Sequence, residues 1–178
     1  KTLREFYPDY KTDEAGIVQS LKAWEMKLSG ILDSMHFESS FTDKEKKRIH
    51  YLVYAYLPNY PSYQKYQLQK QGYEASGEFY FLLSRLIPEE EGLMDMPEYQ
   101  TALLNLVRAF GLRGLQEQDE WKYLKKQMEY IDGQVRSQMI KDFLMDKITT
   151  RYVEKKGTDH LEEIVRFYHD NVKAPEKK

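Results

Sequence analysis

One repeating pattern dominates the sequence: apolar residues recur at steps of three and four along most of the chain. This spacing places side chains on one face of an α-helix, because the helix has about 3.6 residues per turn. The clearest example lies in the range 12–35, where one face carries Ile17, Leu21, Trp24, Leu28, Ile31, Leu32 and Met35. Strand-like alternation never extends beyond a few residues, and only the range 3–7 would tolerate a short strand. The pattern therefore predicts an all-α fold.

Capping residues indicate where the first two helices begin. Thr12 or Asp13 can accept hydrogen bonds from the unpaired amides at the start of the first helix. Thr42 and Glu45 have the spacing of a capping box. In this motif the side chain of each residue bonds the backbone amide of the other, so Thr42 is expected to cap the second helix. Pro58 should stop that helix, because proline has no amide hydrogen to donate.

Glycine and proline divide the rest of the chain. The range Asn59–Ser62 is rich in turn-forming residues and is predicted to be a turn. Pro97 begins a helix that Gly111 or Gly114 ends, and Asp132–Gly133 is expected to interrupt a long helical stretch. Further helices are expected over the ranges 62–71, 75–87, 97–111 and 116–156, and from Thr158 onwards. The sequence thus predicts seven or eight mostly antiparallel helices, in a bundle or a short array of helical hairpins.

The length of the chain sets its domain organisation. Its 178 residues, 41% of them apolar, suffice for one ordinary domain with a core, and two small lobes are the upper bound. We expect one helical domain over residues 1–172 and a linker or tail over residues 173–178, which have nothing to bury. Because the sequence begins at Lys1 without an initiator methionine, we expect it to be a piece of a longer polypeptide.

Composition argues against several classes of partner and site. Lys and Arg number 27 against 29 Asp and Glu, and both signs are mixed along the chain, so we expect no nucleic-acid partner. No apolar run approaches the ~20 residues that cross a bilayer, so no membrane-spanning segment is expected. The absence of cysteine excludes disulfides, thiolate metal sites and thiol catalysis from these residues.

The motifs of common catalytic and metal sites are absent. The four histidines are His36, His50, His160 and His169, and no two of them have the spacing of a zinc-binding pair. There is no Gly-x-Ser-x-Gly turn and no glycine-rich phosphate loop before a helix. Most acidic residues lie near Lys or Arg at helical spacing, as expected for a solvated surface. We therefore assign no catalytic, metal-binding or cofactor-binding residue, and we expect the chain not to be an enzyme.

Tyrosine is the residue type that departs most from average composition. The chain has 15 tyrosines, and eight of them lie between Tyr51 and Tyr80. The simpler interpretation is that these rings bridge helices at the rim of the core, with their hydroxyl groups in water. The alternative is that they form a binding surface for a protein, a small molecule or a glycan. The candidate binding residues are Tyr56, Tyr60, Tyr63 and Tyr66.

Three segments resemble a helical region of TlpA-type, thioredoxin-like thiol–disulfide oxidoreductases of the Bacteroides group. They are the Tyr-Pro-rich stretch Tyr54–Pro61, the helix start Glu98-Tyr99 after Asp95-Met96-Pro97, and the closing Lys173-Ala174-Pro175-Glu176. In that family the helical region precedes the thioredoxin domain. The Gly and Phe usual at the entry to that domain are missing here, and so is the catalytic Cys-x-x-Cys, so no catalytic residue carries over.

The resemblance implies a non-catalytic spacer or docking domain of a periplasmic or cell-envelope protein. Such a domain would position a redox domain or bind its client, so a protein partner or an adjacent domain is expected. The alternative left open by the residues is a helical domain that binds a small molecule or a glycan through the tyrosine-rich segment 51–80.

Overall fold

The computed structural model describes residues 8–70, 72–115 and 119–171, and every regular element in these ranges is helical. The longer helices are α1 (Glu14–Ser34), α2 (Ser39–Tyr54), α4 (Gly77–Leu86), α5 (Pro97–Leu112), α6 (Glu120–Gln134), α7 (Gln138–Lys156) and α8 (Leu161–Asn171). The shorter elements are η2 (Leu57–Asn59), α3 (Tyr60–Ser62), η3 (Tyr63–Gln67) and η4 (Glu91–Leu93). The predicted all-α fold is confirmed. The possible strand over 3–7 and the predicted tail over 173–178 lie outside the described residues.

The helices belong to two compact units. The first unit contains the described residues up to Pro88 together with Asp95–Ala109, and the second contains Glu89–Met94 and the described residues from Phe110 onwards. The boundary therefore falls inside α5. Chain length alone had led us to expect one domain, with two small lobes as the upper bound.

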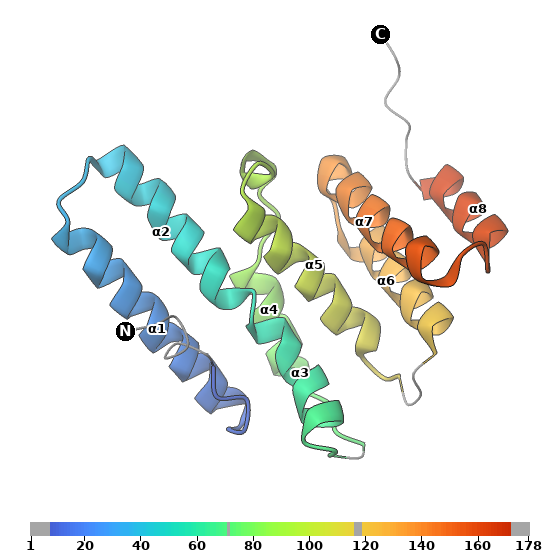
Figure 1. The fold of residues 1–178 in the computed structure, drawn as a ribbon, viewed down its shortest axis with the longest axis horizontal. Helices are drawn as coiled ribbons and strands as arrows, with labels where there is room; N and C mark the ends of the chain where they lie inside the picture. Colours follow the sequence, from blue (N-terminus) through green and yellow to red (C-terminus); the bar gives the residue numbers. More distant parts are fainter. Residues whose placement is uncertain (1–7, 71, 116–118, 172–178) are drawn as a thin grey trace, which may run out of the picture. The chain divides into compact units, whose positions relative to one another are not determined.

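In the first unit, α1 and α2 form an antiparallel hairpin (Figure 1). Asp13 caps α1 by accepting a 2.7 Å hydrogen bond from the amide of Gly16, as the sequence predicted. Ile17 and Leu21 on the predicted apolar face are fully buried. Met35, assigned to the same face, is 55% exposed because it follows the last turn of the helix.

The start of α2 differs from the prediction. The helix already begins at Ser39, and no side chain caps it. The amide of Thr42 bonds the carbonyl of Glu38 at 2.9 Å, which places Thr42 inside the first turn. The Glu45 carboxylate binds Arg48 at 2.9 Å. The predicted capping box at Thr42 and Glu45 is therefore wrong, since both side chains are used elsewhere.

The predicted turn over Asn59–Ser62 is also wrong, because these residues are helical. Pro58 and Pro61 occupy first-turn positions of η2 and α3, where a missing amide hydrogen costs nothing. The buried side chain of Gln64 in η3 donates to the carbonyl of Tyr10 and accepts from Lys70. These bonds tie the short helices to the segment that precedes α1.

In the second unit, α6 packs against α7, and α7 packs against α8. The break expected at Asp132–Gly133 lies slightly later, because α6 continues to Gln134 and Ser137 caps α7 by accepting from the amide of Ile140 at 3.3 Å. Gly157 ends α7 in the left-handed region at φ 72°, as predicted for a glycine helix stop.

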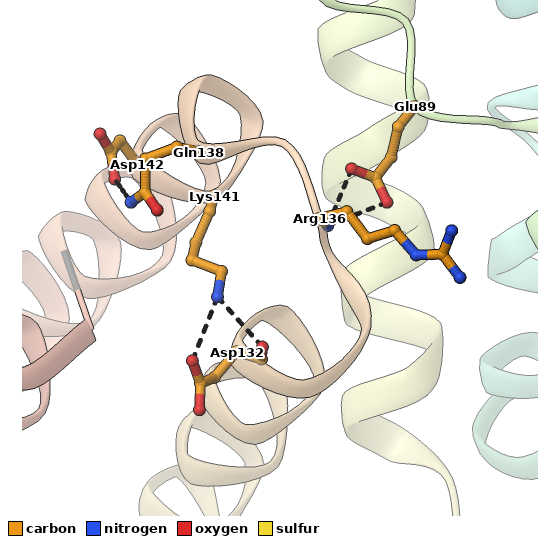
Figure 2. A network of polar contacts seen from close by, with 6 residues as sticks. All are labelled: Glu89, Asp132, Arg136, Gln138, Lys141 and Asp142. Atoms are coloured by element: carbon orange, nitrogen blue, oxygen red, sulfur yellow. Dashed lines mark hydrogen bonds and ion pairs between the residues drawn. The ribbon is translucent and has the colours of Figure 1, made fainter. Parts of the chain in front are cut away.

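Side chains hold the loop between α6 and α7 in place (Figure 2). The Glu89 carboxylate accepts from the backbone amides of Arg136, at 2.9 Å, and Ser137, at 2.7 Å. Lys141 Nζ bonds both the carbonyl and the carboxylate of Asp132, at 3.0 and 3.1 Å. A negative charge thus lies at the amino end of α7 and a positive charge at the carboxyl end of α6, which is the favourable arrangement for both helix dipoles.

Candidate partner-binding groove

A surface groove follows α2, η2 and α5 in the first unit. Its volume is about 380 Å³, and its lining residues are Leu52, Ala55, Tyr56, Asn59, Pro97, Glu98, Thr101 and Asn105. Leu52 and Tyr56 are four residues apart and share one wall, because helical residues at this spacing are neighbours. Glu98, Thr101 and Asn105 follow the same rule on α5 and form the facing wall. We call this feature the α2–α5 groove.

Polar and aromatic contacts fix the two walls of the α2–α5 groove to one another. Asn105 Nδ2 donates a 2.9 Å hydrogen bond to the carbonyl of Ala55, the residue that caps the carboxyl end of α2. A helix end leaves such carbonyls without a partner inside the helix, so the bond satisfies a group that would otherwise need water. The buried rings of Tyr51 and Tyr99 meet edge to face at 4.8 Å, again joining α2 to α5. The groove is therefore preformed.

The exposed apolar side chains in the lining of the groove are Leu52 and Pro97. Leu52 is 40% exposed although its neighbours on both sides are buried. Tyr56 is half-buried and packs against the indole ring of Trp24 on α1, with 5.6 Å between the ring centroids. Pro97 is exposed, and the hydroxyl of Thr101 donates to its carbonyl at 2.8 Å. The hydroxyl donor of Thr101 is therefore used within α5.

Charged side chains lie at one end of the α2–α5 groove. Arg48 Nη1 donates to the Glu45 carboxylate at 2.9 Å, and Arg48 Nε lies 3.5 Å from Glu98 Oε2. This Nε and this Oε2 are both buried, and neither makes a hydrogen bond. Two carboxylates therefore share one guanidinium group, and the cluster carries one net negative charge. The Glu98 side chain remains 26% exposed.

The structure separates the four tyrosines that the sequence singled out. Tyr56 lines the α2–α5 groove. Tyr60 is only 2% exposed and donates its hydroxyl to the carbonyl of Thr12 at 2.8 Å. Tyr63 stacks on Tyr10 with 4.9 Å between the ring centroids. The remaining candidate, Tyr66, is half-buried with the ammonium group of Lys65 over its ring. These four side chains do not form one surface.

A second hollow, of about 570 Å³, lies beside the start of α1. It is lined by Lys11, Thr12, Asp13, Glu14, Ala15, Tyr60, Lys70 and Tyr73. The hydroxyl of Tyr73 donates to Glu14 at 3.2 Å. Burial, assisted by the neighbouring Tyr60 hydroxyl and the Glu14 charge, raises the pKa of Tyr73, so this phenol stays protonated and bonded at neutral pH.

The groove residues on α5 were not recognised as a site from sequence. In the sequence, Pro97 and Glu98 indicate only a helix start, and Thr101 and Asn105 belong to no motif. The two walls come from segments that are distant in sequence, so no local spacing connects them. The exposure of Leu52 between buried Tyr51 and Val53 is seen only in the structure.

A His–Glu–Tyr group elsewhere in the first unit links three helices. His50 Nδ1 lies 2.8 Å from the Glu25 carboxylate, and Nε2 lies 2.8 Å from the carbonyl of Leu86. Both ring nitrogens thus face acceptor oxygens, and which nitrogen donates depends on the tautomer of the ring. Burial, followed by the Glu25 charge, raises the pKa of Tyr54 beside this pair. The arrangement joins α1, α2 and α4.

Within residues 8–70, 72–115 and 119–171, no three His, Asp or Glu side chains are grouped so that they could hold a metal ion. In the same part of the chain, no helix combines the length and apolar character that a membrane span requires. Comparison of the chain with models of protein families, with curated proteins and with solved structures gives no match.

Proposed function

We propose that this chain is a non-catalytic helical domain that binds a segment of a partner protein in the α2–α5 groove. The observation that carries the proposal is the groove itself, which is open, is lined by apolar residues on α2 and mostly polar residues on α5, and is fixed by the Asn105–Ala55 hydrogen bond. Preformed grooves between helices are a recurring way of binding peptides, because little order has to be imposed on binding.

The dimensions of the groove favour a peptide segment. A volume of about 380 Å³ is near the lower end of the ~300–1,000 Å³ typical of ligand pockets. It can take one or two side chains, while the rest of the partner lies over the exposed faces of α2 and α5. Leu52 then supplies apolar contact area on binding, at a position where the free protein leaves it in water.

A selection from displayed random peptides tests this proposal. The whole chain is the bait, and the affinity of the enriched peptides is measured in solution. Thr101→Trp fills the groove, and we expect it to weaken peptide binding at least tenfold. The matched control is Thr150→Trp, at an exposed position of α7 in the second unit, which should leave affinity unchanged. Equal affinity of both variants for the peptides would rule out the groove as the binding site.

The setting we propose rests on the resemblance of Tyr54–Pro61 and Lys173-Ala174-Pro175-Glu176 to TlpA-type proteins. In this setting the chain is part of a cell-envelope protein, and its partner is a following thioredoxin-like domain or that domain's client. Sequencing the parent gene beyond Lys178 tests it. A following Cys-x-x-Cys thioredoxin domain is expected, and an immediate stop codon would contradict the proposed setting while leaving the groove proposal intact.

A second candidate function is the binding of a small molecule or a glycan in the hollow beside α1. The observation in its favour is that half-buried Tyr73 lines this hollow, since aromatic rings stack on sugar faces. Titration of the intrinsic tyrosine and tryptophan fluorescence with a panel of glycans and metabolites tests it. The candidate is abandoned if no ligand changes the emission, or if Tyr73→Leu, which removes the aromatic ring, leaves the response to a ligand unaltered.

A further inference from the structure

We infer that the α2–α5 groove recognises a lysine or arginine side chain of its partner, with the cation paired to Glu98. This inference rests on the proposed function, because it specifies the chemistry of the segment that the groove binds.

The charge balance at the end of the groove favours a cation. Glu45 and Glu98 both pair with Arg48, and helical spacing of three residues holds Glu45 against Arg48 within α2. The guanidinium group is therefore committed first to Glu45, through contacts of 2.9 and 3.2 Å. Glu98 retains a carboxylate charge that is only partly compensated.

The geometry of Glu98 leads to the same conclusion. Its Oε2 lies 3.5 Å from Arg48 Nε, beyond the usual length of an N–H···O hydrogen bond. Glu98 Oε2 is buried without a hydrogen bond, which is costly for a charged group. Because Oε2 is buried, an incoming ammonium or guanidinium group would pair with the exposed part of the Glu98 side chain and compensate the charge that the 3.5 Å contact with Arg48 leaves partly unpaired.

The walls of the groove suit the stem of such a side chain. Lysine and arginine place three or four methylene groups between the backbone and the charge, and these pack on apolar surface while the charge reaches a polar partner. Exposed Leu52 and exposed Pro97 provide such surface beside Glu98. A partner carboxylate in the same position would meet Glu98 as a like charge, so an acidic segment is disfavoured.

Parallel peptide selections on three forms of the whole chain test the inference. The forms are the wild type, Glu98→Gln and the control Glu78→Gln. Glu78 lies in the first turn of α4 as Glu98 lies in the first turn of α5, so both substitutions remove one charge near a helix start. Only Glu98 lines the groove. Thermal melts of the three proteins establish that each is folded before the selections are compared.

We expect peptides enriched on the wild type and on Glu78→Gln to share a lysine or arginine at one position, and those enriched on Glu98→Gln to lack it. Replacing that residue by norleucine should weaken binding to the wild type about tenfold, the scale of a hydrogen-bonded charge pair. The same replacement should change binding to Glu98→Gln by less than about twofold, as expected once the carboxylate is gone.

Two other results separate the inference from the function on which it rests. Peptides that bind in the groove, as shown by their loss on Thr101→Trp, but share no basic residue would overturn the inference and leave the proposed function standing. Peptides that bind equally well to Thr101→Trp would overturn both. A basic preference that persists on Glu98→Gln would overturn the pairing with Glu98.

Discussion

Gly111 of α5 allows a close approach to α6 within the second unit. The residue is buried, and a Cβ atom added there would lie 2.5 Å from Gln127 Cγ and 2.9 Å from Tyr123 Cε2. Contacts below 3.0 Å essentially do not occur for real Cβ atoms. Gln127 is itself only 4% exposed, so its side chain has little room to move away.

The expected effect of Gly111→Ala is the difference between two terms. Forcing an extra carbon atom into a packed contact costs about 1–3 kcal/mol. Replacing glycine by alanine in a helix returns about 0.5–1 kcal/mol. The packing cost exceeds the helical gain, so we predict that the substitution lowers the free energy of unfolding of the second unit by about 1 kcal/mol.

Gly133→Ala is the matched control. Gly133 belongs to α6 in the same unit, and nothing lies within 4 Å of an added Cβ atom. Only the helical gain remains there, so we predict stabilisation by about 0.5 kcal/mol. Urea unfolding followed by circular dichroism compares the two variants with the wild type. Stabilisation by both substitutions would refute the close packing of α5 on α6.

Three further predictions concern caps, the histidine link and pH. Asp13→Ala removes the cap of α1 and should lower the free energy of unfolding by about 1 kcal/mol. Thr42→Ala removes no cap and should lower it by only a few tenths of a kcal/mol. Chemical denaturation measures both variants, and equal losses would contradict the observed helix starts. His50→Ala should lower the free energy of unfolding by about 1 kcal/mol in the same assay, because Glu25 and Leu86 each lose a hydrogen bond. An unchanged denaturation midpoint would contradict this link between the helices. Lys155 lowers the pKa of Glu120 below its ordinary 4.5, so this pair contributes stability that is present above that pH and is lost as the pH falls. Between pH 7 and pH 3, the melting temperature of Lys155→Ala should therefore fall less steeply than that of the wild type. An identical slope for the two proteins would contradict the pairing of Lys155 with Glu120.

Much of the fold follows from helical periodicity, since each long apolar stripe became a helix. The boundaries were less predictable where two local preferences compete. Thr42 and Glu45 have the sequence of a capping box, yet Glu45 pairs with Arg48 and α2 already begins at Ser39. Pro58 and Pro61 signal a turn by composition, but the same residues also fit the first turn of a helix.

The tyrosine-rich segment illustrates what sequence could not decide about the site. Composition alone allowed both packing and binding. The structure places Tyr51, Tyr54, Tyr60 and Tyr80 in the core, which is the packing interpretation for these rings. Tyr56 alone of the four candidate residues lines the α2–α5 groove, because it lies one helical turn beyond Leu52. The α5 wall could not be found from sequence, since nothing local brings Asn105 to Ala55.

The central claim is that a partner segment binds in the α2–α5 groove. The most direct measurement is a ¹⁵N–¹H correlation spectrum of the labelled chain, recorded with increasing amounts of a selected peptide. We predict that the amide signals of Leu52, Thr101 and Asn105 shift together and saturate with one affinity, while those of Lys11 and Tyr73 in the second hollow stay in place. Shifts confined to the second hollow, or to residues outside the first unit, would contradict the account.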